Sequence, residues 1–461
     1  MHHDPALEKS ALFIATLTSF IGPFMISAVN VALPAIQAEW AVDAVGLSWI
    51  STAYLLSTAV VLLPAGKLAD IHGRKKIFTT GLWLYTAAST LAAFVPSIAW
   101  LIGMRVIQGF GAAMFITTGM AILTSVFPPE RRGRVIGIYV AAVYIGLSVG
   151  PFAGGILTQW IGWRSIFALM LPLGAASIFA ALRYLKGEWA DDRQTRFDLA
   201  GSLLYAASIF LLVYGATFLP KPRAIILTGI GVIGAIAFFR LEIRTVHPVF
   251  DVSLFQKNRI FAFSSIAALI NYSATFAVTF LISLYLQYLK GMSPQTAGAV
   301  LMAQPLVMAV FSPLAGRYAD RMEPRRIAST GMGITAIGLF NFVLLKPETR
   351  LPLIIGNLVL MGFGFALFSS PNMSAIMGSV DRRLYGIASG ATATMRLLGQ
   401  MVSMAIATVV LALSMGHRQI DPASYPLFLH SVRICFGIFA ALCAIGVGFS
   451  LSRGRIQQIP V

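Results

Sequence analysis

Runs of about 20 apolar residues recur along the whole chain, separated by short joints rich in Gly, Pro and charged residues. A helix of this length spans the roughly 30 Å hydrocarbon core of a bilayer. The pattern therefore predicts an all-α polytopic membrane protein with 14 transmembrane helices. The expected helices lie near residues 11–35, 46–65, 77–97, 98–124, 135–159, 164–184, 198–219, 223–243, 260–289, 294–316, 326–346, 351–378, 384–414 and 425–451.

The composition supports a membrane protein and argues against a soluble one. Hydrophobic residues make up 57% of the 461 residues and charged residues only 11%, and the mean hydropathy is +0.81. A soluble globular chain carries about 25% charged residues. Cys435 and Cys443 both fall in the last apolar run, so neither a disulfide framework nor a metal site is expected. No cofactor is expected either.

The distribution of Lys and Arg predicts the orientation of the chain. With fourteen spans and a cytoplasmic N-terminus, 24 of the 34 basic residues fall in cytoplasmic segments, 7 in outer segments and 3 within spans. Cytoplasmic loops normally carry such an excess, so both termini are expected in the cytoplasm. The same loops account for the net charge of +17, which therefore indicates contact with anionic lipid and not with nucleic acid.

An internal repeat divides the chain. The segment GKLADIHGRKK at 66–76 recurs as GRYADRMEPRR at 316–326, with Asp70 aligned to Asp320. Both segments follow a predicted span and fall on the predicted cytoplasmic side. A duplication explains this placement if two extra helices are inserted between halves of about six helices each. The expected domains are an N-terminal six-helix bundle at 1–184, a linker with two extra helices at 185–259, and a C-terminal six-helix bundle at 260–461.

Several motifs resemble those of the major facilitator superfamily. GKLADIHGRKK is similar to the loop signature between the second and third helices, and RVIQGFGAA at 105–113 resembles the fourth-helix signature. GLSVGPFAGG at 146–155 resembles the fifth-helix signature of the antiporters. NVALPAI at 30–36, SSPNMSAIMGSV at 369–380 and GIASGATATMRLLGQ at 386–400 resemble the fourteen-span drug:proton antiporters. The resemblance implies a major facilitator fold, with two six-helix bundles plus two inserted helices, in a plasma membrane.

The residues of the 66–76 loop also have a physical interpretation that does not depend on the resemblance. Gly66 permits a tight helix exit, Asp70 can meet an Arg or a helix N-terminus, and the basic residues hold the inner surface. An ordinary basic cytoplasmic loop would explain those basic residues but not the recurrence of the acid at position 320. In the resembling family this loop is a conformational latch. That resemblance implies a gating role for Gly66, Asp70, Gly73, Arg74, Lys75, Asp320 and Arg321.

Small residues recur along the predicted fifth helix. Gly146, Gly150 and Gly154 stand four residues apart, so they share one face and let another backbone approach closely. Pro151 adds a bend. Ordinary close packing explains this pattern whatever the function. The resemblance implies in addition an antiporter motif, and hence export, for Gly146, Gly150, Pro151, Gly154 and Gly155.

Arg105 is the most informative residue of the chain. It lies about seven residues into the predicted fourth helix, or roughly 10 Å deep at 1.5 Å per residue. An Arg inside a span costs about 2.5–3.5 kcal/mol and usually finds partners inside the protein. Gln108 shares its face, and Asn30 lies at a comparable depth in the first helix. One hypothesis is a polar cluster of these three residues; the alternative is that Arg105 binds only backbone carbonyl oxygens and orders the helices.

The predicted helix centres contain no group that exchanges protons. In the resembling antiporters an acidic residue stands five positions before the Asn of the first-helix motif, and this chain has Met25 there. All 17 acidic residues and all 6 His residues fall in loops or near span ends, although carboxylates and His are the usual proton carriers. Three explanations stay open: an acid at a span end such as Asp43 couples transport, an anionic substrate neutralises Arg105, or transport is uncoupled.

Other polar residues within spans are candidates for lining a cavity between the halves. For each of them, hydrogen bonding between helices is the alternative. Pro305 and Pro371 can free backbone carbonyl groups nearby. The expected substrate or coupling residues are Asn30, Arg105, Gln108, Asn271, Gln304, Asn372 and Arg396.

The resemblance and the residues together predict a carrier that works by alternating access. The leading function is an efflux antiporter for drug-like or amphipathic compounds. Its expected partners are a small-molecule substrate, protons as a candidate co-substrate, and membrane lipid, and a monomer is expected. The alternative is a carrier or uniporter for an anionic or neutral metabolite with Arg105 as counter-ion. An enzyme is not expected, because the spans hold no Cys/His cluster and no pair of central carboxylates.

Overall fold

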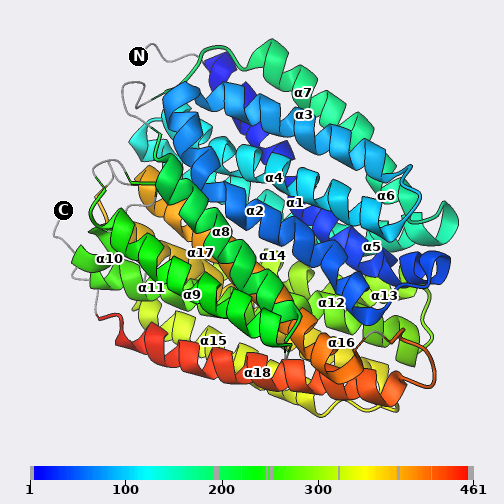
Figure 1. Ribbon diagram of the computed structural model, residues 1–461. Coiled ribbons are helices and arrows are strands. Elements are labelled where there is room, and N and C mark those ends of the chain that lie inside the picture. Colours follow the sequence, from blue (N-terminus) through cyan, green and yellow to red (C-terminus); the bar gives the residue numbers. More distant parts are fainter. Residues whose placement is uncertain are drawn as a thin grey trace.

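The computed structural model describes residues 5–190, 197–219, 221–245, 248–249, 253–319, 322–381, 385–416 and 418–454, which form helices and no strand. Long helices run side by side through the molecule, and both termini lie at the same end, on the left in Figure 1. The first part of the chain forms α1 (Pro5–Trp40), α2 (Ala44–His72), α3 (Arg74–Ala92), α4 (Ile98–Val126), α5 (Pro129–Trp160), α6 (Arg164–Ala168) and α7 (Met170–Tyr184).

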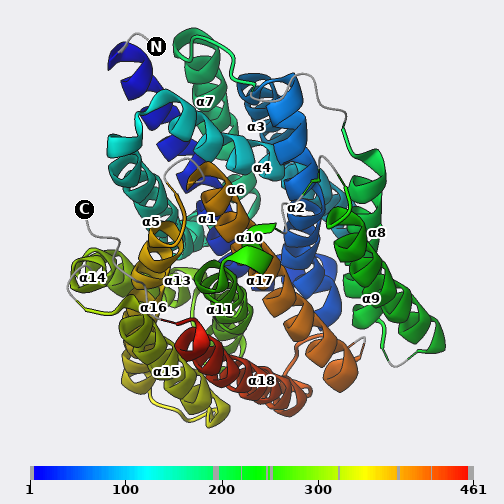
Figure 2. The same cartoon turned by 90° about the vertical axis from the view of Figure 1, so that its left-hand side faces the viewer.

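The rest of the chain forms a hairpin and a second group of helices. The hairpin consists of α8 (Leu199–Thr217) and α9 (Pro222–Glu242), which pack on each other and lie at the outside of the bundle in Figure 2. The second group comprises α10 (Ser253–Lys257), α11 (Arg259–Thr275), α12 (Ala277–Leu284), the π-helical turn η1 (Tyr285–Leu289), α13 (Pro294–Leu301), α14 (Ala303–Ala319), α15 (Pro324–Val343), α16 (Leu351–Gly378), α17 (Tyr385–Met415) and α18 (Tyr425–Ser452).

A helix, or a run of consecutive helices, occupies each predicted apolar range. Among the described residues, twelve runs are long and apolar enough to cross a membrane by length and composition. The predicted ranges 77–97 and 326–346 correspond to α3 and α15, helices of 19 and 20 residues that are not among the twelve. Both begin with basic residues, which lower their apolar character. The membrane-helix architecture is confirmed, and the number fourteen stays a prediction.

Two of the predicted spans are interrupted where proline removes a backbone hydrogen bond. The range 164–184 divides into α6 and α7 at Leu169, three residues before Pro172. The range 294–316 divides into α13 and α14 at Met302, three residues before Pro305. Because proline has no N–H, it cannot donate to the carbonyl four residues earlier, and the helix loosens at that point.

A third interruption has no proline. The range 260–289 breaks at Phe276, between α11 and α12. There the backbone N–H of Ala277 donates to Ser403 Oγ of α17 at 3.0 Å instead of to a carbonyl within its own helix. A side chain that enters the helical ladder in this way is a recognised cause of a local break. The break lies next to the residues that line the central cavity.

The pattern of helix packing in the first group recurs in the second. In the first group α1 packs on α5, α4 on both α2 and α3, and α3 on α7. In the second group α11 packs on α17, α16 on both α14 and α15, and α15 on α18. The two groups meet where α5 packs against α13 and α14, and where α2 packs against α17. This is the arrangement expected of two parallel repeats around a central site.

Candidate functional site

A cavity lies between the two groups of helices. Residues of α1, α5, α11, α12, α14, α16 and α17 line it, together with Phe276 at the helix break. They are Ile26, Ser27, Asn30, Leu147, Tyr272, Thr275, Phe276, Thr279, Gln304, Pro305, Met308, Phe365 and Gln400. Its free volume is about 70 Å³, below the roughly 300–1,000 Å³ of pockets that hold a drug-sized ligand. A larger compound therefore requires the two groups of helices to separate.

The described residues that line the cavity are apolar, aromatic or polar, and none of them is charged. Tyr272, Phe276 and Phe365 supply ring faces, and the Tyr272 and Phe365 rings meet edge to face with centroids 5.4 Å apart. Asn30 and Gln304 supply amides that can both donate and accept hydrogen bonds. Flat aromatic compounds with polar groups at their edges suit such a surface. Asn30 and Gln304 are the predicted site residues that line the cavity.

Asn30 is held by serine side chains from two other helices. Ser51 Oγ of α2 donates to Asn30 Oδ1 at 2.9 Å, and Ser283 Oγ of α12 donates to the Asn30 backbone oxygen at 2.9 Å. The predicted cluster of Asn30 with Arg105 is replaced by these contacts. The sequence holds no signal for them, because both serines lie far from Asn30 along the chain.

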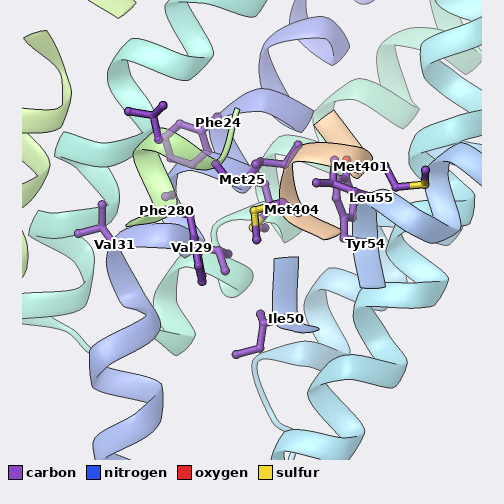
Figure 3. Close-up of a cluster of buried hydrophobic side chains, with 14 of the residues drawn as sticks. Phe24, Met25, Val29, Val31, Ile50, Tyr54, Leu55, Phe280, Met401 and Met404 are labelled. Carbon is purple, nitrogen blue, oxygen red and sulfur yellow. The ribbon is translucent and has the colours of Figure 1, made fainter. Parts of the chain in front are cut away.

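Met25 is fully buried in an apolar cluster. The cluster includes Tyr54 of α2 and the pair Met401 and Met404 of α17, so it extends across both groups of helices. Figure 3 shows Met25 among these side chains. The position at which the resembling antiporters carry an acid is therefore buried and apolar here.

Arg105 is completely buried in α4 and does not line the cavity. Its Nε donates to the Ile50 carbonyl oxygen at 3.0 Å and its Nη1 donates to Gln108 Oε1 at 2.5 Å. The guanidinium lies 4.3 Å from the centroid of the Tyr54 ring. Gln108 in turn donates to Ser89 Oγ at 2.6 Å. The predicted contact of Arg105 with Gln108 is present, and together with the backbone bond it joins α2, α3 and α4.

Three other predicted residues take different positions. Asn271 is fully buried one residue before Tyr272, and neither side-chain atom has a hydrogen-bond partner among the described residues. Arg396 is half-buried on α17, one helical turn before Gln400. Asn372 does not line the cavity. Its Nδ2 donates to the Ser264 carbonyl oxygen at 3.0 Å, and its Oδ1 accepts a hydrogen bond from an arginine that the sequence did not single out.

That arginine is Arg453, which follows α18. Its Nη1 donates to Asn372 Oδ1 at 2.8 Å and to Ser264 Oγ at 3.2 Å, and its Nη2 donates to the Pro324 carbonyl oxygen at 3.0 Å. Burial lowers the pKa of the Arg453 guanidinium to about 10, so the group stays protonated at neutral pH. The cluster fastens the end of α18 to α11, α15 and α16, which is a structural role.

Contacts between the two groups close the face of the molecule farthest from the termini. Gln287 Nε2 donates to the Val31 carbonyl oxygen at 3.0 Å, and the Tyr288 hydroxyl donates to Gln37 Oε1. Thr52 of α2 and Thr408 of α17 share a hydrogen bond of 3.1 Å. Gly155 of α5 lies so close to Pro294 that an added Cβ would come within 2.4 Å of its carbonyl oxygen. The cavity is thus sealed on this face.

The loop at 66–76 carries an internal ion pair. Arg74 Nη2 lies 2.8 Å from Asp70 Oδ1, and Arg74 Nη1 donates to Ser125 Oγ at 2.5 Å. Gly66 lies in α2, where a Cβ would meet nothing within 4 Å, so the predicted tight exit falls instead on Gly73, whose φ is +113°. Asp320 and Arg321, the predicted latch residues of the repeat, lie outside the described residues.

The segment after α7 docks on this loop. Glu188 accepts a hydrogen bond of 2.8 Å from the backbone N–H of Lys75, in the first turn of α3, and the Trp189 carbonyl oxygen accepts one of 2.8 Å from the Arg74 N–H. A Cβ at Gly73 would lie 2.5 Å from Glu188 Cδ. An acid at a helix N-terminus satisfies its free N–H groups. The sequence did not indicate this contact, because Glu188 and Lys75 are far apart along the chain.

The glycines of α5 form the contact with α1. A Cβ at Gly146 would lie 2.5 Å from the Phe20 carbonyl oxygen, and one at Gly154 would lie 2.6 Å from Ala28 Cα. Gly150 faces Ser27, which lines the cavity. The close approach predicted from their spacing is present. In the same part of α5, the Pro151 carbonyl oxygen approaches Gly298 of α13, and Gly155 approaches Pro294.

Comparisons with known proteins agree with this architecture. The family described as Major Facilitator Superfamily matches residues 15–404 and 264–454. The riboflavin transporter RibZ of Clostridioides difficile is 31% identical over 94% of this chain and 96% of its own length. The multidrug resistance protein Stp of Mycobacterium tuberculosis is 32% identical over 87% of this chain and 76% of its own length.

A likeness to solved structures extends over nearly the whole fold. The crystal structure of a D-xylose–proton symporter superposes with a TM-score of 0.69 and 11% identity, and the match covers 96% of this chain and 97% of that one. At such low identity the likeness shows the fold alone. The family match and the two relatives go further: the chain belongs to the major facilitator superfamily and is a multi-pass membrane transporter of a small molecule, not an enzyme.

Proposed function

We propose that this transporter exports a small amphipathic, aromatic compound from the cell by alternating access, with residues 1–184 and 260–461 as the two moving bundles. The observation that carries the proposal is the central cavity between the two groups of helices, to which the first group contributes the Asn30 amide and the second group contributes aromatic rings and the Gln304 amide. Its small volume and the sealed far face fit one state of a carrier that opens by relative motion of its halves.

The proposed direction of transport rests on the orientation of the chain in the membrane and on the glycine motif of α5. The excess of basic residues favours cytoplasmic termini, so the sealed face is the outer one. The glycines of α5 match the antiporter signature, which favours export. Relatives named for multidrug resistance and for methylenomycin A resistance support the same direction.

The roles of individual residues follow from their positions. Asn30 and Gln304 are proposed to bind substrate, because they line the cavity. The loop with Asp70, Gly73 and Arg74 is proposed to act as the gating latch at the inner face. Arg105 and Gln108 are proposed to fix α4 against α2 and α3, because both are buried and hydrogen-bonded away from the cavity.

Proton antiport has less support than export. None of the described residues that line the cavity is an Asp, Glu or His. Asp43, the acid at a span end that the sequence suggested for coupling transport, caps the N-terminus of α2, where its side chain accepts a hydrogen bond from the Gly46 N–H at 2.6 Å. The second candidate function, a carrier for a neutral or anionic metabolite, is favoured by the similarity to a riboflavin transporter and by the absence of acid in the lining.

Cellular accumulation and transport in liposomes test the proposal. Bacterial cells that express the protein should accumulate less of a fluorescent aromatic compound than cells that express a Tyr272→Ala variant. Tyr318→Ala is the matched control, because Tyr318 lies on α14 but is 60% exposed on the surface. Equal accumulation with Tyr272→Ala and with the parent protein would contradict the assigned cavity, and increased accumulation with the parent protein would contradict export.

A further inference from the structure

We propose that the compound carried in this cavity bears an anionic group and that Arg396 of α17 binds that group at the inner end of the cavity. The inference rests on the proposed function and narrows it to a substrate class. It assigns the counter-ion role that the sequence suggested for Arg105 to a different arginine.

Arg396 lies at membrane depth and next to the cavity. It is eleven residues from the start of α17 at Tyr385, or about 16 Å at 1.5 Å per residue. Gln400, four residues on and therefore on the same helix face, lines the cavity. The next residue, Leu397, packs against Leu62 of α2 and Ala113 of α4, so this part of α17 lies at the contact between the two bundles. Tyr139 and Tyr144 of α5 lie within electrostatic range of Arg396.

Arg396 differs from the buried arginines Arg105 and Arg453 in having no partner among the described residues. Among the described residues no hydrogen bond, ion pair or ring contact satisfies its guanidinium, and no neighbouring acid balances it. Arg105 and Arg453, in contrast, are each held by at least two hydrogen bonds. An unbalanced cation at this depth is unfavourable unless it has a functional partner, and an anion from outside the protein supplies one.

A tyrosine hydroxyl lies beside the cavity and within electrostatic range of Arg396. The Tyr144 hydroxyl shares a hydrogen bond of 2.5 Å with Ser369 Oγ of α16, which joins the two bundles. Tyr144 also packs with Tyr272, Met308 and Phe365, and all three line the cavity. Hydroxyl donors beside an arginine form a suitable site for a carboxylate or a similar oxyanion. The aromatic body of the compound would then lie among the rings of the cavity.

An anionic substrate also removes the need for a proton carrier. The interior of a cell is electrically negative, so an anion leaves down its electrical gradient. A potential of about 100 mV sustains a concentration ratio of about 50-fold for one elementary charge. A cavity whose described lining residues include no acid, and Met25 where the resembling antiporters carry one, suit such a potential-driven exporter.

Binding of three dyes of different charge to the purified protein tests the assignment. The dyes are 5-carboxyfluorescein as the anion, riboflavin as the neutral compound and rhodamine 123 as the cation. Binding is measured by fluorescence polarisation and by the rise in the melting temperature of the protein. Arg396→Gln should weaken carboxyfluorescein binding at least about tenfold and change riboflavin binding by less than about twofold. Arg396→Lys keeps the positive charge and should bind carboxyfluorescein more tightly than Arg396→Gln. Arg240→Gln on α9 removes the same charge from an exposed position and should behave like the parent protein.

Transport in proteoliposomes tests the driving force. With the pH clamped, an interior-positive potassium diffusion potential should draw carboxyfluorescein inward, and a pH gradient at zero potential should not. The anion site would be overturned if the protein bound riboflavin or rhodamine 123 but not carboxyfluorescein, or if Arg396→Gln weakened the binding of all three dyes equally. Either outcome would leave the proposed carrier intact. Accumulation driven by the pH gradient alone would overturn the potential-driven mechanism. Failure of all three dyes to bind the folded protein would contradict the proposed function itself.

Discussion

Ser283 Oγ donates a hydrogen bond of 2.9 Å to the backbone oxygen of Asn30 and so joins α12 of the second bundle to α1 of the first. Gln287, one turn later, donates to both Ser283 Oγ and the Val31 carbonyl oxygen. The sealed face therefore depends on a short row of polar contacts beside a residue that also lines the cavity. Breaking one of them should change the balance between closed and open states.

Gln287→Ala should open this face more often. The variant loses hydrogen bonds worth about 1 kcal/mol each, which shifts the equilibrium about fivefold or more. A cysteine placed at Thr279, in the cavity lining, should then react about fivefold faster with a membrane-impermeant thiol reagent added from the outer side. The native Cys435 and Cys443 are buried and contribute little background.

Asn341→Ala is the control for this experiment. Asn341 donates to Asn357 Oδ1 at 3.1 Å within the second bundle, so its loss removes a comparable bond without touching the contact between bundles. An equal rise in labelling for both variants would show that general loosening, and not the interface, controls access to the cavity.

Arg105→Ala should reduce stability and transport but not binding. The change leaves Gln108 Oε1 and the Ile50 carbonyl oxygen without their partner, at a cost on the order of 3 kcal/mol. The melting temperature and the transport rate should fall, and the dissociation constant of a bound compound should change by no more than about twofold. A tenfold loss of affinity with unchanged melting temperature would restore Arg105 as the counter-ion.

Two glycines of α5 offer a matched test of helix packing. Gly154→Ala places a methyl group 2.6 Å from Ala28 Cα, which is backbone and cannot move aside. Overpacking of this kind costs about 1–3 kcal/mol, so the melting temperature should fall by several °C. At Gly137, on the same helix, a Cβ meets nothing within 4 Å, and Gly137→Ala should leave stability unchanged or slightly raised. A similar effect of both substitutions would contradict the close contact of α1 with α5.

Met25→Glu should make stability depend on pH. The carboxylate would replace a fully buried apolar side chain, and burial disfavours its charged form. The variant should therefore melt at a lower temperature at pH 8 than at pH 5, by about 2 °C or more relative to the parent protein. Met25→Gln has nearly the same shape without the charge and should show no such difference. If the glutamate variant melts alike at both values, position 25 is hydrated and not dry.

Glu188→Ala should loosen the start of α3. Without the side chain, the Lys75 N–H loses its acceptor, which costs about 1 kcal/mol. Amide hydrogen exchange at Lys75 and its neighbours should then speed up about fivefold. Glu188→Gln keeps an acceptor oxygen and should retain most of the protection. Unchanged exchange in the alanine variant would mean that the contact does not persist in solution.

The sequence predicted the helices well because a helix that crosses a bilayer requires a run of about 20 apolar residues, which is visible in the sequence. It also predicted the contact of Arg105 with Gln108, since residues three apart on a helix are neighbours. Spacing likewise predicted the close contact of the α5 glycines. These successes share one cause, which is that the relevant geometry lies within a single helix.

The identity of the helices and side chains that meet could not be predicted from the sequence. Asn372 was expected to serve the cavity, and it is bound instead by Arg453, 81 residues away. The break of α11 and α12 has no proline, because its cause is Ser403 of a distant helix. The aromatic lining residues Phe276 and Phe365 gave no signal, since phenylalanines facing lipid and phenylalanines facing a cavity look alike in a chain with 32 of them.

The hairpin of α8 and α9 makes the two sides of the transporter unequal. α8 packs against both α2 and α17, and the Tyr205 hydroxyl donates to the Ala59 carbonyl oxygen at 2.9 Å, so the hairpin covers one of the two seams between the bundles. Among the described residues no such helix covers the opposite seam, where α5 meets α13 and α14. We therefore expect that, when the bundles separate, a compound dissolved in the lipid reaches the interior sideways along the α5 seam, whereas the α8 seam excludes it.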